Sequence, residues 1–306
     1  MSENKITRVF ANPKSGSIRI DGTIEVVDAQ GNIIAVRTDE KLCGCGLSQD
    51  KPFCDKSHAN YVNIVATLLQ DARNRKVALT PLGVTAVRAS EIRKRSLENR
   101  VAAGESLIGV KFGGALLKDS SENKNYEGIF GYLTDAMLVN STLRLADFIS
   151  PIAEAEVVFK LNQELSRVIE LSEVQNYVSH VAAGIEIFDC RYGPIDPFIN
   201  DAIADNACSG AIAIGEWVDA SNVNLLESNI TIYEAEQLKE SVSATSIAGN
   251  PWQAVANVSK KLNEVGVILP AGSIIFSGSA TNGIAMQPGK YRVEISGLGE
   301  VSFEAN

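Results

Sequence analysis

The sequence predicts an α+β protein in two parts, a small β-rich module over residues 1–59 and a larger mixed β domain with flanking helices over residues 60–306. Apolar residues within 18–37 lie on both sides of an Asp-Ala-Gln-Gly-Asn stretch, which is typical of a hairpin turn. Residues 61–103 have the spacing of two helices, and after about residue 105 short apolar stretches alternate with Gly, Asn and Pro. A chain of 306 residues is long enough for two such domains.

The helices are marked by their ends as well as by their periodicity. A Thr-Pro-Leu-Gly stretch separates an apolar-faced segment, 61–73, from a charge-rich segment, 86–104, which we expect on the surface. A later helix is expected to begin at Asn250, a good N-cap, with Pro251 in the first helical position. The apolar stripe of this helix and its closing glycine are Val255, Val258, Leu262 and Gly266.

The net charge of −9 is unevenly placed along the chain. Residues 1–59 hold eight basic and eight acidic residues, so the whole excess of acid falls in the larger part. Such a surface repels nucleic acid and anionic lipid, and neither is expected as a partner. A small anionic substrate would need local cations, from a metal or a lysine. No apolar run approaches the roughly 18 residues of a membrane helix, and the first ten residues lack a signal-like apolar region, so we expect a cytoplasmic protein.

Three of the five cysteines and one of the two histidines are concentrated in one short segment. Cys43, Cys45, Cys54 and His58 lie within sixteen residues, a spacing that suits a metal centre better than disulfides. Three thiolates and one imidazole suit either an iron–sulfur cluster or a structural zinc ion. The single residue between the first two cysteines is unusual for zinc without excluding it, so spacing alone leaves both open.

The complete segment resembles the CDGSH iron–sulfur family, with the pattern C-x-C-x2-S/T-x3-P-x-C-D-G-S/T-H. The resemblance covers about residues 15–59. It implies a 2Fe–2S cluster with Cys43 and Cys45 on one iron and Cys54 and His58 on the other. The matching residues are Cys43, Cys45, Ser48, Pro52, Cys54, Asp55, Ser57 and His58.

One residue departs from that pattern, because Lys56 stands where the family has glycine. A cation there is expected to disfavour protonated His58 and to raise the reduction potential of the cluster. Imidazole protonates near physiological pH once its bond to metal weakens, whereas thiolates hold longer. We therefore expect the cluster to be lost in acid below about pH 6.

Three glutamates in strand-like stretches form a second candidate metal site. Glu154 and Glu156 alternate with small or apolar residues, which places both on one face of a strand, and Glu186 lies in another strand-like stretch. A pair of glutamates alone is more typical of a solvated strand face. A third carboxylate favours a hard divalent cation such as Mg²⁺ or Mn²⁺.

A second resemblance covers about residues 60–306. This region is similar to the 2-oxo-pentenoate hydratase and 2-oxo-3-hexenedioate (4-oxalocrotonate) decarboxylase branch of the fumarylacetoacetate hydrolase superfamily. The resemblance implies a roll like a β-barrel, a homo-oligomer, a divalent metal held by Glu154, Glu156 and Glu186, and Lys111 in the active site. The matching landmarks are Gly109-Val-Lys111, Gly131-Tyr-Leu133, Glu154-Ala-Glu156, Glu186-Ile-Phe-Asp189-Cys-Arg191, Ala204-Asp205-Asn206-Ala207, Gly249-Asn-Pro251, Pro270-Ala-Gly272 and Pro288-Gly289.

Departures from this family bear on the reaction. Hydratases carry an aspartate two residues before the glycine that matches Gly131, whereas this chain has Ile129, as the decarboxylases do. The proline that precedes it in decarboxylases is Gly128 here, and hydroxyl residues of the family are replaced in Gly114-Ala115-Leu116. Hydration of a dienol benefits from an acid/base carboxylate, whereas loss of CO₂ needs an electron sink. The resemblance therefore implies a carbon–carbon lyase, and the expected reaction is decarboxylation of 2-oxo-3-hexenedioate in catabolism of the aromatic meta-cleavage type.

Two alternatives to decarboxylation remain: a 2-oxo-pent-4-enoate hydratase, and a non-catalytic electron-transfer protein in which the cluster serves a redox partner. A hydrolase of carbon–carbon bonds is disfavoured because it would need a histidine base. His180 falls in a stretch from Ser172 that predicts a helix and matches no catalytic position of the family. Cys190 and Cys208 are expected to be small buried residues.

Overall fold

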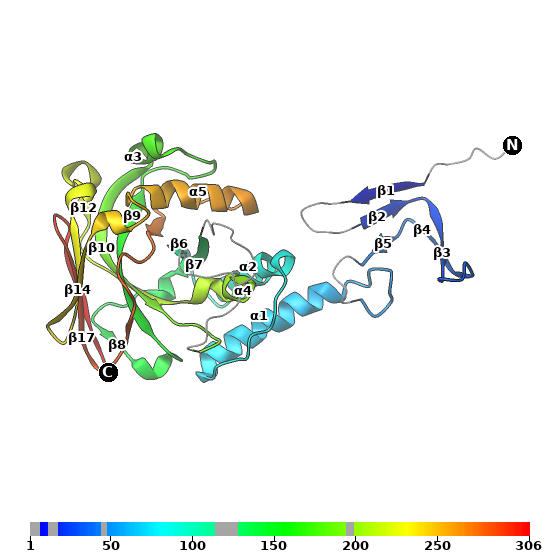
Figure 1. Cartoon of the computed structure of the whole chain (residues 1–306), viewed down its shortest axis with the longest axis horizontal. Helices are drawn as coiled ribbons and strands as arrows, with labels where there is room; N and C mark the ends of the chain where they lie inside the picture. Colours follow the sequence, from blue (N-terminus) through cyan, green and yellow to red (C-terminus); the bar gives the residue numbers. More distant parts are fainter. Residues whose placement is uncertain (1–6, 12–17, 44–47, 114–127, 194–198) are drawn as a thin grey trace.

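The computed structural model describes residues 7–11, 18–43, 48–113, 128–193 and 199–306, with residues 58 and 59 described by their backbone alone. It has the α+β architecture expected from the sequence, and its larger part is a curled half-barrel of strands (Figure 1). Among the described helices, none combines the length and the apolar character that crossing a membrane requires.

The N-terminal part is made of short antiparallel strands. β3 and β4 form the hairpin expected within 18–37, and Asp28 closes its turn by accepting hydrogen bonds from the backbone of Gln30 and Asn32, both at 2.9 Å. β2 pairs with both β1 and β5. These strands are β1 (Arg8–Ala11), β2 (Ile18–Asp21), β3 (Thr23–Val27), β4 (Ile33–Thr38) and β5 (Lys41–Leu42).

An eight-stranded sheet forms the centre of the larger part. Six of its strands follow one path in the order β11, β10, β9, β15, β6 and β7, with β12 paired to β10 and β16 paired to β9. The long neighbours β9 and β10 are antiparallel, and β15 joins β6 in parallel. The strands are β6 (Leu107–Gly113), β7 (Ile129–Thr134), β9 (Ile152–Leu161), β10 (Val178–Phe188), β11 (Ser209–Ile214), β12 (Val218–Asp219), β15 (Ile274–Phe276) and β16 (Ile284–Ala285).

A five-stranded sheet packs against one face of the central sheet, and the apolar side chains between the two sheets form the main core. Val157 of β9 and Ile185 of β10 meet Ile230 and Val293 there, and all four are fully buried. The strands of the second sheet are β8 (Thr142–Leu143), β13 (Asn229–Glu234), β14 (Gln237–Ser243), β17 (Gly289–Ile295) and β18 (Gly299–Ala305).

Three helices cover the opposite side of the central sheet, near β6 and β7 (Figure 1). They are α1 (Ser57–Arg75), α2 (Ala86–Ala102) and α4 (Ile199–Ala204), and they share a second core cluster with Ile129. α1 runs without interruption across residue 59, so the expected domain boundary falls inside a helix. α3 (Val174–Tyr177) and α5 (Gln253–Val265) complete the α-helices of the described chain.

Three expectations about the helices need correction. α2 is not simply a surface helix, since Arg88, Arg93 and Arg100 are buried; Arg93 donates to the carbonyl of Phe130 at 2.6 Å. α5 begins later than expected, at residue 253, because a turn that includes the Asn250 side chain precedes it. The helix expected from residue 172 is the single turn of α3, and His180 lies on β10.

Short 3₁₀ segments connect many of these elements. They are Asp135–Met137, Leu145–Asp147, Leu171–Glu173, Asn206–Cys208, Ala220–Asn222, Leu225–Glu227 and Ala244–Ser246.

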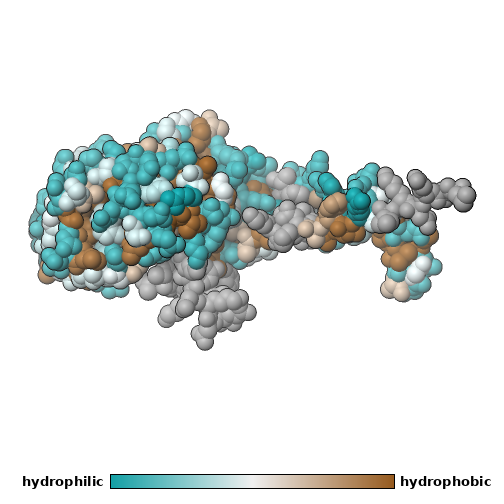
Figure 2. All heavy atoms as spheres, turned by 90° about the horizontal axis from the view of Figure 1, so that it is seen from above, coloured by the Kyte–Doolittle hydropathy of each residue, from teal (hydrophilic) through white to brown (hydrophobic). Residues whose placement is uncertain are grey.

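The β3–β4 hairpin leaves large apolar side chains exposed, and Figure 2 shows brown atoms at this narrow end of the molecule. The exposed residues of the hairpin are Val27, Ile33, Ile34 and Val36.

Candidate active site

The register of β9 and β10 brings the three predicted glutamates together. Glu154 is directly opposite Glu186, and Glu156 is opposite Gly184, two residues further along on the same face. One carboxylate oxygen from each lies within 4.8 Å of the others. Only glycine fits opposite Glu156, because a Cβ on Gly184 would lie 2.4 Å from Val158 Cγ2 and 2.9 Å from Phe276 Cε1.

Burial makes this acidic group unusual. Glu156 and Glu186 are fully buried and Glu154 is half-buried, although like charges on neighbouring strands repel each other. Burial, together with the charge of Glu186 and only partly offset by Lys111, raises the pKa of Glu154 to about 7. Burial and the two neighbouring carboxylates also raise the pKa of Glu156 well above its ordinary value. The carboxylates therefore need more positive charge than the surrounding residues provide.

Lys111 of β6 supplies one cation to the group. Its Nζ lies 2.9 Å from Glu186 Oε1 and 5.5 Å from the centre of the Phe188 ring. Burial alone would lower the pKa of Lys111, but the carboxylates of Glu186 and Glu154 outweigh this effect and the pKa is raised. The ammonium is therefore held in its charged form at neutral pH.

The donor set fits a hard divalent cation. Glu156 Oε2 accepts a hydrogen bond from the backbone of Gly278 at 2.9 Å. Glu156 Oε1 and Glu186 Oε2 are buried and have no hydrogen-bond partner among the described residues. Three carboxylates against one lysine leave two negative charges unbalanced, and oxygen ligands of this kind are those that Mg²⁺ and Mn²⁺ prefer.

The cysteine segment folds back on itself in the described part. Leu42 and Phe53 form an antiparallel bridge, Cys43 N donates to Pro52 O at 2.7 Å, and Cys54 N donates to Lys41 O at 2.7 Å. Cys43 and Cys54 thus flank this bridge and lie on the same face of the pair. Cys45 and the side chain of His58 lie outside the described residues.

Other residues of this segment shape its loop. Asp55 accepts hydrogen bonds from the backbone of Ser57 at 2.8 Å and of Gln49 at 2.9 Å, and Ser48 Oγ accepts one from Asp50 N at 3.0 Å. The hydrogen bonds from Ser57, followed by that from Gln49, hold the pKa of Asp55 well below its usual range. Lys56 immediately before α1 has φ +68°, the left-handed region that glycine adopts most easily. The conformation explains why glycine suits this position.

The comparisons with known proteins account for both parts of the chain. Residues 15–59 match the family described as "Iron-binding zinc finger CDGSH type". A 4-oxalocrotonate decarboxylase from Pseudomonas sp is 30% identical over 227 residues, which cover 72% of this chain and 87% of that protein. The chain belongs to the 4-oxalocrotonate decarboxylase and 2-keto-4-pentenoate hydratase family of the fumarylacetoacetate hydrolase superfamily.

Other members of this decarboxylase and hydratase family support the assignment. A 2-hydroxyhexa-2,4-dienoate hydratase from Comamonas testosteroni is 28% identical over 81% of this chain and 98% of its own length. The solved structure of 4-oxalocrotonate decarboxylase from Pseudomonas putida G7, complexed with magnesium and adipate, has the same fold with a TM-score of 0.75. It is 22% identical and covers 81% of this chain and 98% of its own. The expectation of a lyase family is thereby confirmed.

Ile129, the position expected to separate hydratases from decarboxylases, lies beside Lys111. Gly131 pairs with Lys111 and Ile129 pairs with Gly113, so Ile129 is a diagonal neighbour of Lys111 on the same face. Ile129 is buried and packs in the core cluster under α1, α2 and α4. Gly128 has φ +79°, which proline cannot adopt, so the proline of family decarboxylases could not replace it in this conformation. Gly114, Ala115 and Leu116 lie outside the described residues.

Several family landmarks hold the site in place instead of facing it, a role that sequence reasoning missed. Asp189 accepts backbone hydrogen bonds from Ile149 at 3.0 Å and Ser150 at 2.8 Å. Asn206 binds the outer edge of β7, where its Oδ1 accepts from Tyr132 N at 2.7 Å and its Nδ2 donates to Tyr132 O at 2.9 Å. This pairing completes the edge of the strand that neighbours Lys111.

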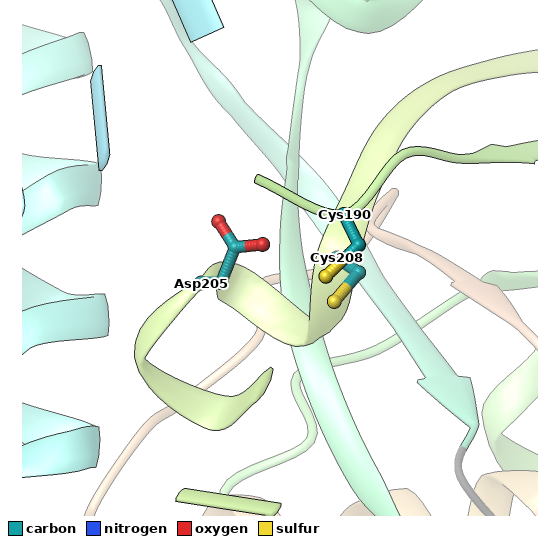
Figure 3. A group of neighbouring side chains, drawn as sticks. All are labelled: Cys190, Asp205 and Cys208. Atoms are coloured by element: carbon teal, nitrogen blue, oxygen red, sulfur yellow. The ribbon is translucent and has the colours of Figure 1, made fainter. Parts of the chain in front are cut away.

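Asp205 belongs to a second group of possible metal ligands, with Cys190 and Cys208 (Figure 3). All three are buried, and both sulfur atoms lie side by side in the figure. Asp205 nevertheless forms a buried ion pair with Arg191. Arg191 also donates a hydrogen bond from its Nη2 to the backbone carbonyl of Asp205 at 2.6 Å. Burial raises the pKa of the Cys208 thiol well above its ordinary value. Both cysteines are small buried residues, as expected.

His180 lies far from the three glutamates. It is six residues from Glu186 along β10, or roughly 20 Å at the rise of a strand. Its Nδ1 forms a hydrogen bond with Ser179 Oγ at 2.9 Å, and it pairs across the sheet with Asp219 of β12. The position agrees with the expectation that His180 is not a catalytic base.

Proposed function

We propose that the chain is a divalent-metal-dependent decarboxylase of a small 2-oxo dicarboxylic acid, with 2-oxo-3-hexenedioate as the substrate to test first. The observation that carries the proposal is the buried group of three glutamates with Lys111 ion-paired to one of them at 2.9 Å. Ile129 beside Lys111 favours decarboxylation over hydration, because no carboxylate stands at that position to move protons to and from water.

Glu154, Glu156 and Glu186 are the residues that would hold Mg²⁺ or Mn²⁺. When bound, such an ion supplies Lewis-acid polarisation of the 2-oxo group and binds the adjacent carboxylate. The backbone N–H of Gly278 fixes one oxygen of Glu156 at 2.9 Å, which orients this carboxylate for the task. Because Glu156 and Glu186 are fully buried, electrostatic contacts to them are stronger than they would be in water.

Lys111 is the residue proposed to stabilise charge in the reaction. The bond from the leaving carboxylate carbon to the substrate chain breaks, CO₂ departs, and the electron pair moves through the conjugated system to the 2-oxo oxygen. An ammonium held in place by Glu186 can donate a hydrogen bond to that developing enolate oxygen. Protonation of the dienolate on carbon or oxygen then gives the five-carbon 2-oxo acid or its enol.

We also infer that residues 43–58 hold a 2Fe–2S cluster through Cys43, Cys45, Cys54 and His58. The fold of the described part supports this, because Cys43 and Cys54 flank the Leu42–Phe53 bridge on one face. The cluster is proposed to serve redox or regulatory functions and has no step in the decarboxylation. Purified protein should show visible absorbance that is lost in a Cys54→Ser variant.

The experiment for the decarboxylase follows loss of 2-oxo-3-hexenedioate in the ultraviolet while CO₂ is measured, first with Mg²⁺ and then with EDTA. The proposal predicts Mg²⁺-dependent loss with one CO₂ per substrate. A hydrated product with no CO₂ would assign the hydratase function instead. Protein that retains its cluster absorbance and turns over neither this substrate nor 2-oxo-pent-4-enoate would contradict both.

A further inference from the structure

A small pocket lies between α1, α2 and the edge strand β7, among residues that the proposed reaction does not use. It has a volume of about 30 Å³ and receives side chains from both helices and from the segment after β10. Three arginines, Arg73, Arg100 and Arg191, are among its lining residues. The side chains of Arg100 and Arg191 are almost completely buried, and that of Arg73 is half-buried.

Two of the three guanidinium groups have carboxylate partners. Arg191 forms its ion pair with Asp205, and Arg100 Nη2 lies 2.6 Å from Glu105 Oε2. Arg73 instead donates from Nη2 to a neutral carbonyl, that of Gly210, at 3.0 Å. Within the described residues, no carboxylate lies in ion-pair contact with Arg73, although Glu105 and Asp189 offset part of its charge from a greater distance.

A hydroxyl group in the same pocket also lacks a partner. Ser96 Oγ is buried and makes no hydrogen bond among the described residues. Buried hydroxyl groups are normally hydrogen-bonded, so one that lines a cavity beside an unpaired guanidinium points to a bound ligand that accepts hydrogen bonds. Burial and the charges of Arg100 and Arg191 lower the pKa of Arg73 to about 9, in agreement with a cation that lacks its counter-charge.

We propose that this pocket binds one small monovalent anion of the size of chloride, held by Arg73 with Ser96 as a hydrogen-bond donor. The volume sets the size of the ligand. A pocket of about 30 Å³ has room for a halide ion or a few water molecules. The charges set its sign, because three arginines line the pocket and the one carboxylate among the described lining residues, Asp205, is paired with Arg191.

The anion would bridge α1, which begins beside the cysteine segment, and the segment after β10 in the larger part. Arg73 lies in the last turn of α1, the helix that begins beside the cysteine segment at Ser57. Arg191 follows β10, which carries Glu186. An anion between α1 and the segment after β10 would stabilise the docking of α1 on the larger part, a role independent of the decarboxylation.

The test compares thermal unfolding of the full chain in sodium chloride and in sodium gluconate at equal ionic strength. Gluconate is much larger than chloride and should bind the pocket less tightly, so the wild type should unfold at a higher temperature in chloride. Arg73→Gln should remove this difference. Arg75→Gln is the matched control, since Arg75 is exposed on the same turn of α1 and does not line the pocket, and it should retain the difference.

Ser96→Ala is a second test that applies even if Arg73→Gln fails to fold, because it removes one hydroxyl and keeps every charge. It should weaken apparent chloride affinity by roughly 3- to 10-fold, the effect of one hydrogen bond. Anomalous scattering from crystals soaked in bromide should place one ion beside Arg73. Equal unfolding temperatures of the wild type in both salts, or a chloride effect unchanged in both Arg73→Gln and Ser96→Ala, would overturn the proposal.

Discussion

At the scale of single residues, Lys111 and the three glutamates form a charged group that burial would penalise in isolation. Two of the carboxylates are fully buried, and a single lysine cannot balance three of them. Such an arrangement is more easily explained by binding than by stability, because apolar residues in the same places would stabilise the fold at least as well.

Replacing Lys111 with methionine separates catalysis from metal binding. We expect kcat to fall by roughly 10²- to 10³-fold, as for loss of one donor to a developing oxyanion. Binding of Mn²⁺ should be retained, because the three carboxylates remain. Lys94→Met, at an exposed position on α2, serves as the control for loss of a lysine. Equal losses in the two variants would contradict the role of Lys111.

Lys56 offers a second residue-level prediction. A lysine with φ +68° is strained, whereas glycine adopts this conformation without penalty. Lys56→Gly should therefore stabilise the N-terminal module by about 1 kcal/mol, measured as an upward shift of the denaturant midpoint for loss of cluster absorbance. Lys51→Gly is the control at a nearby exposed lysine that is outside the left-handed region. A Lys56→Gly protein that loses its cluster more easily would refute the explanation.

At the scale of elements, the candidate active site depends on how the edge strand β7 is held. Asn206 completes the edge of β7 with its side-chain amide, while its own φ of +55° lies in the left-handed region. Gly131 allows the close approach, since a Cβ there would lie 2.3 Å from the carbonyl oxygen of Asn206. The strand that pairs with Lys111 is thus positioned by residues outside the group of three glutamates and Lys111.

The amide of Asn206 can be tested apart from its backbone conformation. Asn206→Gly keeps the left-handed backbone accessible and removes both hydrogen bonds to Tyr132. We expect the free energy of unfolding to fall by about 1–3 kcal/mol, the effect of unsatisfied backbone groups. Gly249→Ala measures the effect of backbone strain alone, because it changes a left-handed position where the added Cβ meets nothing within 4 Å. An Asn206→Gly midpoint in urea equal to that of the wild type would show that the edge needs no cap.

Much of this arrangement was accessible from sequence because its signals are local. Alternation placed Glu154 and Glu156 on one face, and the turn residues around Asp28 marked the hairpin. The register that sets Glu186 opposite Glu154 is a long-range pairing, which no local pattern encodes. The same holds for the buried arginines of α2, since charge alone suggests exposure until the helix is seen to pack over β7.

At the scale of the whole molecule, the chain combines a segment that matches the CDGSH type with a region similar to the decarboxylases and hydratases. The CDGSH-type match ends at residue 59, and α1 begins at Ser57 and continues into the larger part. Strand β5, which leads into the cysteine segment, and strands β9 and β10, which carry the glutamates, belong to separate sheets.

Independence of the two centres can be measured with Cys54→Ser. This variant should lose the visible absorbance of the cluster because one of four ligands is removed. Turnover of 2-oxo-3-hexenedioate with Mg²⁺ should remain within about 2-fold of the wild type, since a factor of two is only ~0.4 kcal/mol in the barrier. Lys51→Ser controls for a change in the same loop. Complete loss of turnover in Cys54→Ser alone would place the cluster in the catalytic function.

The central claim is that Glu154, Glu156 and Glu186 form one site for a divalent cation. Its most direct test is titration with Mn²⁺ followed by electron paramagnetic resonance, for the wild type, Glu156→Gln and the control Glu164→Gln at an exposed position. We predict one tight Mn²⁺ per chain, competed by Mg²⁺, in the wild type and the control, and a loss of at least 10-fold in affinity in Glu156→Gln. Equal binding by all three proteins would contradict the account.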